Sequence, residues 1–228
     1  MPHRRPVVVV LAAGRGSRFA STTHKLLQPL GSTTVLGQTL GHVLASGLPM
    51  VVVTTPTLAA EASRTVASRD VVVMPETQAA LGMGRSLATG VAARSDGAGW
   101  LILPADMPLV QPSTLKAVAA ALAHHPVAFA QHLGRRGHPV GFAAELYSEL
   151  RLLTGDEGAR HLVGRIERLV RHAGGDVDVV ALVDDIEEFE VRTVVERGRD
   201  LEMEDRRLVR RVIMRLGLAA GRHHQQVH

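Results

Sequence analysis

Short apolar runs rich in valine alternate with longer segments rich in alanine and leucine along the chain as far as Gln131. Such short, continuously apolar runs are typical of strands that are buried on both faces, and the longer segments have the length of helices. The apolar runs predict strands at Val7–Leu11, Met50–Thr54, Val71–Met74, Trp100–Leu103 and Val127–Gln131. The segments between them predict helices at Thr33–Ser46, Thr57–Ser68, Met83–Arg94 and Ser113–His124. Ser113 is expected to cap the last of these helices, since serine is a favoured N-cap residue.

This regular alternation predicts an α/β fold with a mostly parallel sheet that helices flank on both faces. The crossover connections are expected to be right-handed. A chain of 228 residues has the size of one such domain. We therefore predict a single domain over residues 1–220 and a flexible tail over residues 221–228.

The pattern weakens after Gln131. The segment His132–Phe142 contains so much glycine and arginine that we do not expect a core strand there and place it at the rim of a cleft. Further predicted elements are helices at Ala143–Leu153 and Glu157–His172, a late strand at Val177–Val183, and an arginine-rich helix at Leu201–Leu218.

Composition narrows the classes of protein to consider. Hydrophobic residues make up 46% of the chain, enough for a substantial core, and the absence of cysteine excludes disulfides, thiolate metal sites and a cysteine nucleophile. The net charge of +4 is compatible with an anionic ligand, while basic and aromatic residues are not interleaved as in nucleic-acid-binding proteins. The apolar run before Gly14 is too short for a signal peptide or a membrane span. We therefore expect a cytoplasmic protein with no nucleic-acid or membrane partner.

The glycine-rich turn after the first predicted strand is the first candidate for function. The stretch Ala12–Arg18 lacks the third glycine of the dinucleotide-binding fingerprint, and no acidic residue follows the second predicted strand. It also lacks the Gly-Lys-Ser/Thr end of a P-loop, because His24 precedes Lys25 and a leucine follows it. Two interpretations remain, a purely structural turn and a loop that wraps a nucleoside triphosphate.

The triphosphate interpretation agrees with the residues in and after this turn. The small residues Ala12–Gly14 let backbone N–H groups approach phosphate oxygens, and Arg18 and Lys25 would supply positive charge. The chain has 26 basic residues, and Lys25 and Lys116 are its lysines. An isolated lysine beside this turn indicates a need for a compact ammonium, which would neutralise charge on the α-phosphate.

Asp106 lies just past the end of the fourth predicted strand, within the sequence Pro-Ala-Asp-Met-Pro. Open α/β sheets bind their ligands at the carboxyl ends of the strands. Mg2+ combines one or two carboxylates with phosphate and water oxygens. We therefore interpret Asp106 as the ligand of a Mg2+ ion that bridges triphosphate oxygens. The alternative is an aspartate that only forms the turn or caps the next helix.

The stretch LAAGRGSRF followed by HKLLQPLG resembles the L-A-A-G-x-G-x-R…K-x-L signature of nucleotidyltransferases with a molybdenum-cofactor-type fold. Further segments that resemble this family are, in order, Leu81–Leu87 (LGMGRSL), Pro104–Pro108 (PADMP), Arg136–Val140 (RGHPV) and Gly155–Arg160 (GDEGAR). As a series they are similar to molybdenum-cofactor cytidylyltransferases, which are MobA-like NTP transferases. Guanylyltransferase relatives usually have a second glycine where this chain has Ala13, so the resemblance favours cytidine.

The resemblance implies a Rossmann-like nucleotidyltransferase fold of the nucleotide-diphospho-sugar transferase type. It also implies transfer of CMP from CTP to molybdopterin, with Mg2+ as cofactor and an acceptor molybdoenzyme as a further partner. By resemblance the catalytic residues are Arg18, Lys25 and Asp106, and Asp106 is the metal ligand. By resemblance the substrate-binding residues are Leu11, Ala12, Ala13, Gly14, Gly16, Ser86, Arg136, His138 and Arg160.

Several of these assignments have structural alternatives. Ser86 contacts the base or the ribose, or it caps a helix N-terminus. His138 lines the pterin side of the cleft, or it is a loop residue beside two arginines. Arg160 faces a phosphate of the second substrate, or it lies on a helix surface.

The implied transfer needs little covalent chemistry from the protein. A phosphate of molybdopterin would attack the α-phosphorus of CTP in line, and pyrophosphate would leave. An ionised phosphate needs no general base, so catalysis would consist of positioning and charge neutralisation.

One departure from the family pattern concerns a second metal ligand. The family usually has a D-x-D-T-P-E-D segment after the last strand, and the corresponding stretch here is Glu190–Glu196, with Arg192 at the ligand position. Three interpretations stay open: Glu190 or Asp185 replaces the carboxylate, Arg192 supplies positive charge instead, or the chain binds nucleotide without turning it over. The rival hypotheses are therefore a nucleotidyltransferase with another phosphate acceptor and a non-catalytic carrier of nucleotide or molybdenum cofactor.

Overall fold

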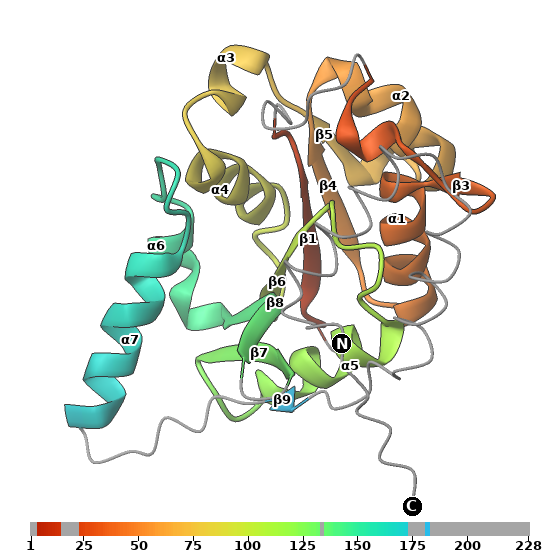
Figure 1. The fold of residues 1–228 in the computed structure, drawn as a ribbon. Coiled ribbons are helices and arrows are strands. Elements are labelled where there is room, and N and C mark those ends of the chain that lie inside the picture. Colours follow the sequence, from red (N-terminus) through yellow and green to blue (C-terminus); the bar gives the residue numbers. More distant parts are fainter. Residues whose placement is uncertain (1–3, 15–22, 133–134, 173–180, 183–228) are drawn as a thin grey trace, which may run out of the picture.

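The computed structural model describes residues 4–14, 23–132, 135–172 and 181–182. Their main feature is a seven-stranded sheet in the order β5-β4-β1-β6-β8-β7-β9 (Figure 1). Its strands are β1 (Val7–Ala12), β4 (Met50–Thr54), β5 (Val71–Val73), β6 (Gly99–Pro104), β7 (Val127–His132), β8 (Arg135–Ala143) and β9 (Ala181–Leu182). A separate hairpin consists of β2 (Pro29–Leu30) and β3 (Thr33–Thr34). The predictions for residues 201–218 and 221–228 lie outside the described residues.

The half of the sheet that contains β1 is parallel. β1 pairs in parallel with β4 on one side and with β6 on the other, and β4 pairs in parallel with β5. In this register Val9 lies between Val51 and Ile102, and all three side chains are buried. The predicted α/β class with a mostly parallel sheet is confirmed, and the predicted strands lie where the valine-rich runs placed them.

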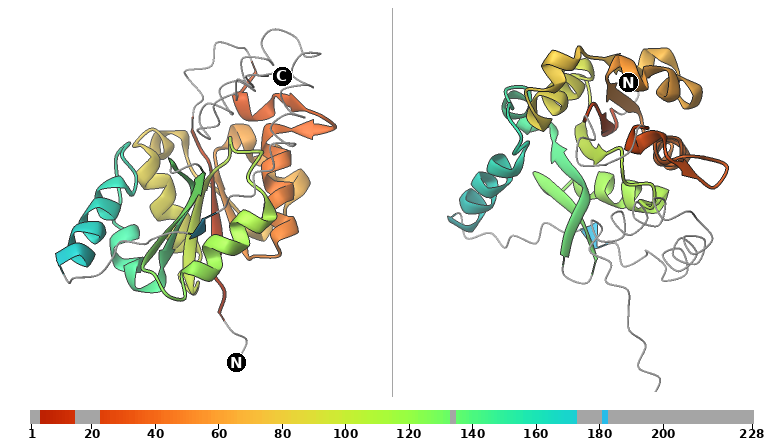
Figure 2. Two further views of the ribbon diagram at one scale, coloured as in Figure 1. Left: turned by 60° about the horizontal axis from the view of Figure 1, so that its bottom comes forward. Right: turned by 45° about the horizontal axis from the view of Figure 1, so that its top comes forward.

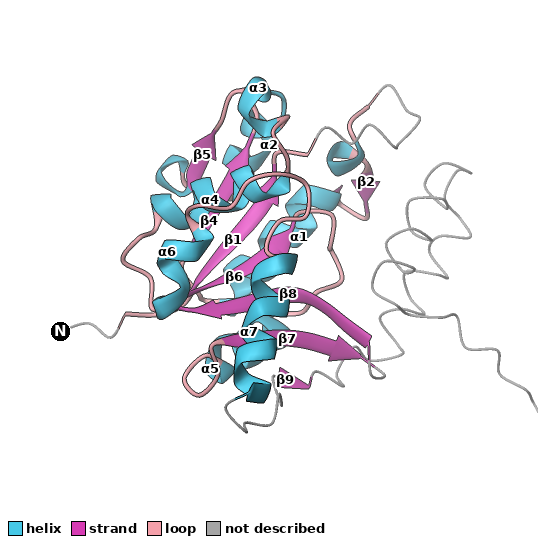
Figure 3. Ribbon diagram, turned by 90° about the vertical axis from the view of Figure 1, so that its left-hand side faces the viewer, coloured by secondary structure: helices cyan, strands magenta, loops and turns pink. Residues whose placement is uncertain are grey.

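Helices cover both faces of the sheet (Figures 2 and 3). The helices are α1 (Val35–Ser46), α2 (Pro56–Thr65), α3 (Glu76–Ala79), α4 (Met83–Ala93), α5 (Pro112–Ala121), α6 (Tyr147–Leu150) and α7 (Arg160–His172). Successive residues of a strand point to opposite faces. Val8 and Val10 pack with residues of α1, α2 and α5, while Val7 and Val9 pack with residues of α4, α6 and α7. The alternation along β1 therefore divides the core into two clusters.

The prediction that His132–Phe142 contains no core strand is wrong. β8 occupies most of this segment and lies inside the sheet, antiparallel to both β6 and β7. A side chain at Gly141 would place its Cβ 3.0 Å from Val118 Cγ1 and 3.2 Å from Leu122 Cδ2. The glycine therefore gives room for α5 to pack on the sheet, and its presence does not indicate a loop.

Several helix boundaries also differ from the predictions. α1 begins at Val35, because Thr34 Oγ1 accepts the Gly37 N–H at 3.0 Å and so caps the helix. The prediction that Ser113 caps α5 is wrong. Gln111 holds the N-cap position and Pro112 the first helical position, where proline is favoured.

The two helices predicted after β8 are shorter in the structure. A 3₁₀ turn and α6 occupy part of the segment predicted as one helix at 143–153, and α7 begins three residues later than expected, at Arg160. The late strand is described at Ala181–Leu182. Among the described residues, no helix combines the length and the apolar character that a membrane crossing requires.

Candidate active site

The carboxyl ends of β1 and β6 meet at one edge of the sheet, and the predicted catalytic residue Asp106 lies there. β1 ends at Ala12 and is followed by Ala13 and Gly14, while Ala105 and Asp106 follow β6. The Ala105 N–H donates to the Leu11 oxygen at 3.1 Å, which ties the two strand ends together. Parallel pairing of β1 with β6 thus brings the glycine-rich turn and the aspartate to one place.

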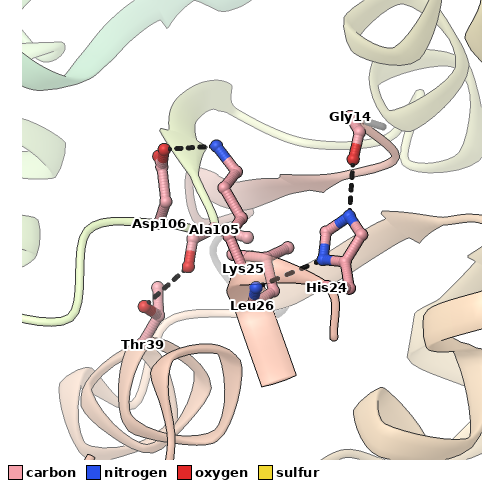
Figure 4. A network of polar contacts seen from close by, with 7 residues as sticks. All are labelled: Gly14, His24, Lys25, Leu26, Thr39, Ala105 and Asp106. Atoms are coloured by element: carbon pink, nitrogen blue, oxygen red, sulfur yellow. Dashed lines mark hydrogen bonds and ion pairs between the residues drawn. The ribbon is translucent and has the colours of Figure 1, made fainter. Parts of the chain in front are cut away.

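Lys25 and Asp106 form an ion pair at this edge (Figure 4). Lys25 Nζ lies 2.7 Å from Asp106 Oδ2, although 81 positions separate the two residues in the chain. The side chains are 27% and 12% exposed, respectively. The pair is therefore partly shielded from water, which strengthens its attraction, but a ligand has access to it.

His24 connects the two sides of the turn. Its Nδ1 accepts the Leu26 N–H at 3.2 Å, so the ring proton is on Nε2, which donates to the Gly14 oxygen at 2.9 Å. These bonds join the residues that flank positions 15–22. His24 could not be singled out from the sequence as a structural residue, because its role depends on a carbonyl ten positions away.

A second cluster forms where the start of α4 meets the segment 154–158. The Gly84 N–H donates to the Gly155 oxygen at 2.8 Å, and the Gly155 N–H donates to the Leu81 oxygen at 3.2 Å. A Cβ at Gly84 would lie 2.6 Å from the Thr154 oxygen, and one at Gly82 would lie 2.3 Å from the Gly155 carbonyl carbon. Gly82 also has a φ of +103°, which favours glycine. The LGMGRSL and GDEGAR segments are thus joined by close backbone contact.

Ser86 lies inside this part of the molecule. The N-cap of α4 is Gly82, so the alternative that Ser86 caps the helix is wrong. The Ser86 side chain is buried and its hydroxyl contacts Met74 Sδ at 3.5 Å. Contact between this hydroxyl and a base or ribose stays a prediction.

The whole RGHPV segment, residues 136–140, belongs to β8. The β6–β8 register pairs Gly99 with Ala143 and Ile102 with Val140. Residues of β8 that precede Val140 therefore extend toward the edge of the sheet that carries Asp106. Arg136 forms an ion pair with Glu167 of α7, and its guanidinium lies 4.7 Å from the Phe129 ring centroid.

The remaining predicted site residues are placed as follows. His138 is half-buried and precedes Pro139 through a cis peptide bond. Arg160 is the first residue of α7 and is exposed. Gly16, Arg18 and Arg192 lie outside the described residues, as does the whole stretch 190–196. The roles proposed for these residues stay predictions.

The site fits a metal ion that takes most of its ligands from a bound nucleotide. Within the described ranges, no group of three or more His, Cys, Asp or Glu side chains is arranged to hold a metal ion by itself. The Asp106 carboxylate is largely shielded and already accepts a cation, the Lys25 ammonium. One such carboxylate suits Mg2+ in combination with phosphate and water oxygens.

Comparison with known proteins identifies a family for most of the chain. A family model described as the MobA-like NTP transferase domain matches residues 8–173. Among curated proteins, the bifunctional protein GlmU of Zymomonas mobilis is 34% identical over 124 residues. That match covers 54% of this chain and 28% of GlmU, so it spans about a quarter of the relative's length.

Solved structures from mycobacteria share the fold over nearly the whole chain. Rv0371c from Mycobacterium tuberculosis H37Rv is 26% identical, with a TM-score of 0.67 and coverage of 92% of this chain and 100% of that one. A structure of Rv0371c in complex with manganese is 25% identical, with a TM-score of 0.62 and coverage of 90% and 98%.

Proposed function

The chain belongs to the family of MobA-like NTP transferases and is a nucleotidyltransferase, and on this premise we propose that it transfers CMP from CTP to molybdopterin. The observation that carries the proposal is the 2.7 Å pair of Lys25 and Asp106 beside the small-residue turn after β1. An ammonium and a carboxylate at the carboxyl ends of neighbouring parallel strands suit a nucleoside triphosphate and its divalent cation.

Mg2+ is the proposed cofactor, and Asp106 is the residue that would hold it. The manganese complex of Rv0371c supports a divalent cation in a relative of this fold. When bound, such an ion neutralises charge on the triphosphate oxygens.

In the proposed reaction, an ionised phosphate oxygen of the acceptor attacks the α-phosphorus of CTP. A new P–O bond forms to the acceptor, and the bond from the α-phosphorus to the pyrophosphate oxygen breaks. Lys25 leaves Asp106 and stabilises the negative charge that the α-phosphate oxygens carry in the transition state. The protein transfers no proton, since the attacking phosphate is already ionised.

The turn after β1 contributes backbone N–H groups and shape. Ala12 and Ala13 are both buried, so their methyl groups belong to the core and their backbone borders the site. The bond between His24 and Gly14 holds the start of the turn beside Lys25. The proposed preference for CTP is supported by the resemblance at Ala13. The choice of molybdopterin as acceptor is supported by the resemblance of the RGHPV and GDEGAR segments.

The test is a pyrophosphate-release assay with Mg2+, each of the four nucleoside triphosphates and molybdopterin. Release that requires both CTP and molybdopterin supports the proposal. Release with CTP and a different phosphate, or with another nucleotide, would contradict the substrate assignment and leave the transferase class intact.

A nucleotidyltransferase with another phosphate acceptor is the second candidate. The 34% identity to the bifunctional protein GlmU over 124 residues favours it. A sugar phosphate added to the same assay distinguishes the two. A carrier that binds nucleotide without turnover predicts CTP binding with no pyrophosphate under any of these conditions.

A further inference from the structure

The backbone of Ala105, the residue directly before Asp106, is held from two sides. The Ala105 N–H donates to the Leu11 oxygen of β1 at 3.1 Å. On the other side, Thr39 Oγ1 of α1 lies 2.9 Å from the Ala105 oxygen (Figure 4). Thr39 and Ala105 are each 1% exposed. The carbonyl group directly before Asp106 is therefore buried, and it depends on a protein donor.

The Thr39 hydroxyl has a single proton and lies near two acceptors. It is 2.9 Å from the Val35 oxygen as well as 2.9 Å from the Ala105 oxygen. The Val35 oxygen already accepts the Thr39 backbone N–H in the regular pattern of an α-helix. For the Ala105 oxygen, Thr39 is the donor found within the described part of the chain. A buried carbonyl needs a hydrogen-bond donor, so the Thr39 hydroxyl donates its hydrogen bond to the Ala105 oxygen.

The next turn of α1 holds the far end of the same loop. Gln38 Nε2 can only donate, so at 2.8 Å His42 Nε2 accepts from it. The His42 proton is then on Nδ1, which donates to the Val110 oxygen at 2.9 Å. Thr39 and His42 thus attach both ends of the loop 105–110, which carries Asp106, to one rigid helix.

We propose that Thr39 is a positioning residue that orients the Asp106 carboxylate toward the divalent cation. It acts through the Ala105 carbonyl and touches neither nucleotide nor metal. This inference rests on the proposed function, because that function makes Asp106 the metal ligand. Partners that orient a metal ligand typically change metal affinity by about ten- to a hundredfold when they are removed.

The experiment is a titration of the full chain with Mn2+ in the presence of each of the four nucleoside triphosphates, followed by electron paramagnetic resonance. Thr39→Val keeps the shape of the side chain and removes the hydroxyl, so its apparent Kd for Mn2+ should rise about tenfold. Thr39→Ser restores the donor and should stay within about twofold of the unmodified chain.

Ser46→Ala is the matched control for a general loss of stability. Ser46 also lies in α1, is 3% exposed, and donates to the Val43 oxygen at 2.6 Å, remote from Asp106 in the chain. Its Mn2+ affinity should be unchanged even where thermal unfolding shows a loss of stability similar to that of Thr39→Val.

The outcomes separate the inference from the proposed function. Unchanged affinity in Thr39→Val, or equal weakening in Ser46→Ala, would overturn the role of Thr39 and leave the proposed function standing. If Asp106→Asn binds Mn2+ as well as the unmodified chain with every nucleotide, the metal site itself is refuted, and the role of Thr39 with it.

Discussion

The two clusters of motif residues are held together by different kinds of contact. Around Asp106 one backbone bond, from Ala105 to Leu11, is joined by contacts from three side chains, the ammonium of Lys25, the hydroxyl of Thr39 and the imidazole of His24. At the start of α4 the contacts run from backbone to backbone, through Gly84 and its partner segment. The first arrangement leaves charged groups beside a ligand, whereas the second uses its glycines for close packing. Substitutions in the first cluster should therefore reduce chemistry, and those in the second should reduce stability.

The largest effect is expected at Asp106. Asp106→Asn removes the negative charge but keeps the size of the side chain. Turnover should fall by about a thousandfold, the upper range for loss of one electrostatic group in an active site. Pyrophosphate release measures this loss, and thermal unfolding should show that the fold survives. If Asp106→Asn lost as much stability as the packing variant Gly84→Ala, the distinction between the two clusters would be contradicted.

The second largest effect is expected for Lys25→Met. It removes the ammonium and keeps an unbranched side chain, so charge on the α-phosphate loses its partner. Turnover should fall by about a hundredfold, while CTP affinity, measured by calorimetry, should fall less. Loss of affinity with unchanged turnover of bound CTP would mean that Lys25 only binds the ground state.

The cluster at the start of α4, which uses its glycines for close packing, is tested at Gly84. Gly84→Ala places a Cβ 2.6 Å from the backbone oxygen of Thr154, and a backbone atom moves less easily than a side chain. The free energy of unfolding should fall by about 2 kcal/mol, as for other overpacked sites, in a denaturant titration.

Gly41→Ala is the matched control for Gly84→Ala. Gly41 lies in α1, and a Cβ there meets nothing within 4 Å. This variant should gain about 0.5–1 kcal/mol, because alanine favours the helix more than glycine does. Equal behaviour of the two variants would contradict the packing role of Gly84.

The smallest effect is expected at Arg136. Its side chain is 46% exposed and pairs with Glu167, so Arg136→Gln should change the free energy of unfolding by less than about 1 kcal/mol. If the arginine contacts the second substrate, KM for molybdopterin should rise while KM for CTP stays constant. Parallel changes in both KM values would argue against an acceptor role.

The sequence allowed the parallel half of the fold to be predicted, because buried strands need continuous apolar runs and valine supplies them. It failed at β8, where Gly141 looked like a loop residue. That glycine makes room for Val118 and Leu122 of the helix that follows β6, and a contact of this kind cannot be read from local sequence.

In the candidate site, too, contacts made by the tertiary fold could not be predicted from local sequence. Lys25 was predicted because it is an isolated lysine after a glycine-rich turn, and Asp106 because it lies just past a predicted strand within a family motif. Thr39 and His24 were missed because a threonine in a helix and a histidine beside a lysine are ordinary in sequence. Their importance arises from the carbonyl groups of Ala105 and Gly14, which the tertiary fold brings to them.

Binding of a triphosphate and its cation is expected to separate Lys25 from Asp106. A crystal structure with CTP and Mg2+ tests this separation most directly. We expect Lys25 Nζ at an α-phosphate oxygen and the Asp106 carboxylate at the cation. A nucleotide bound elsewhere, with the 2.7 Å contact between the two side chains intact, would contradict it.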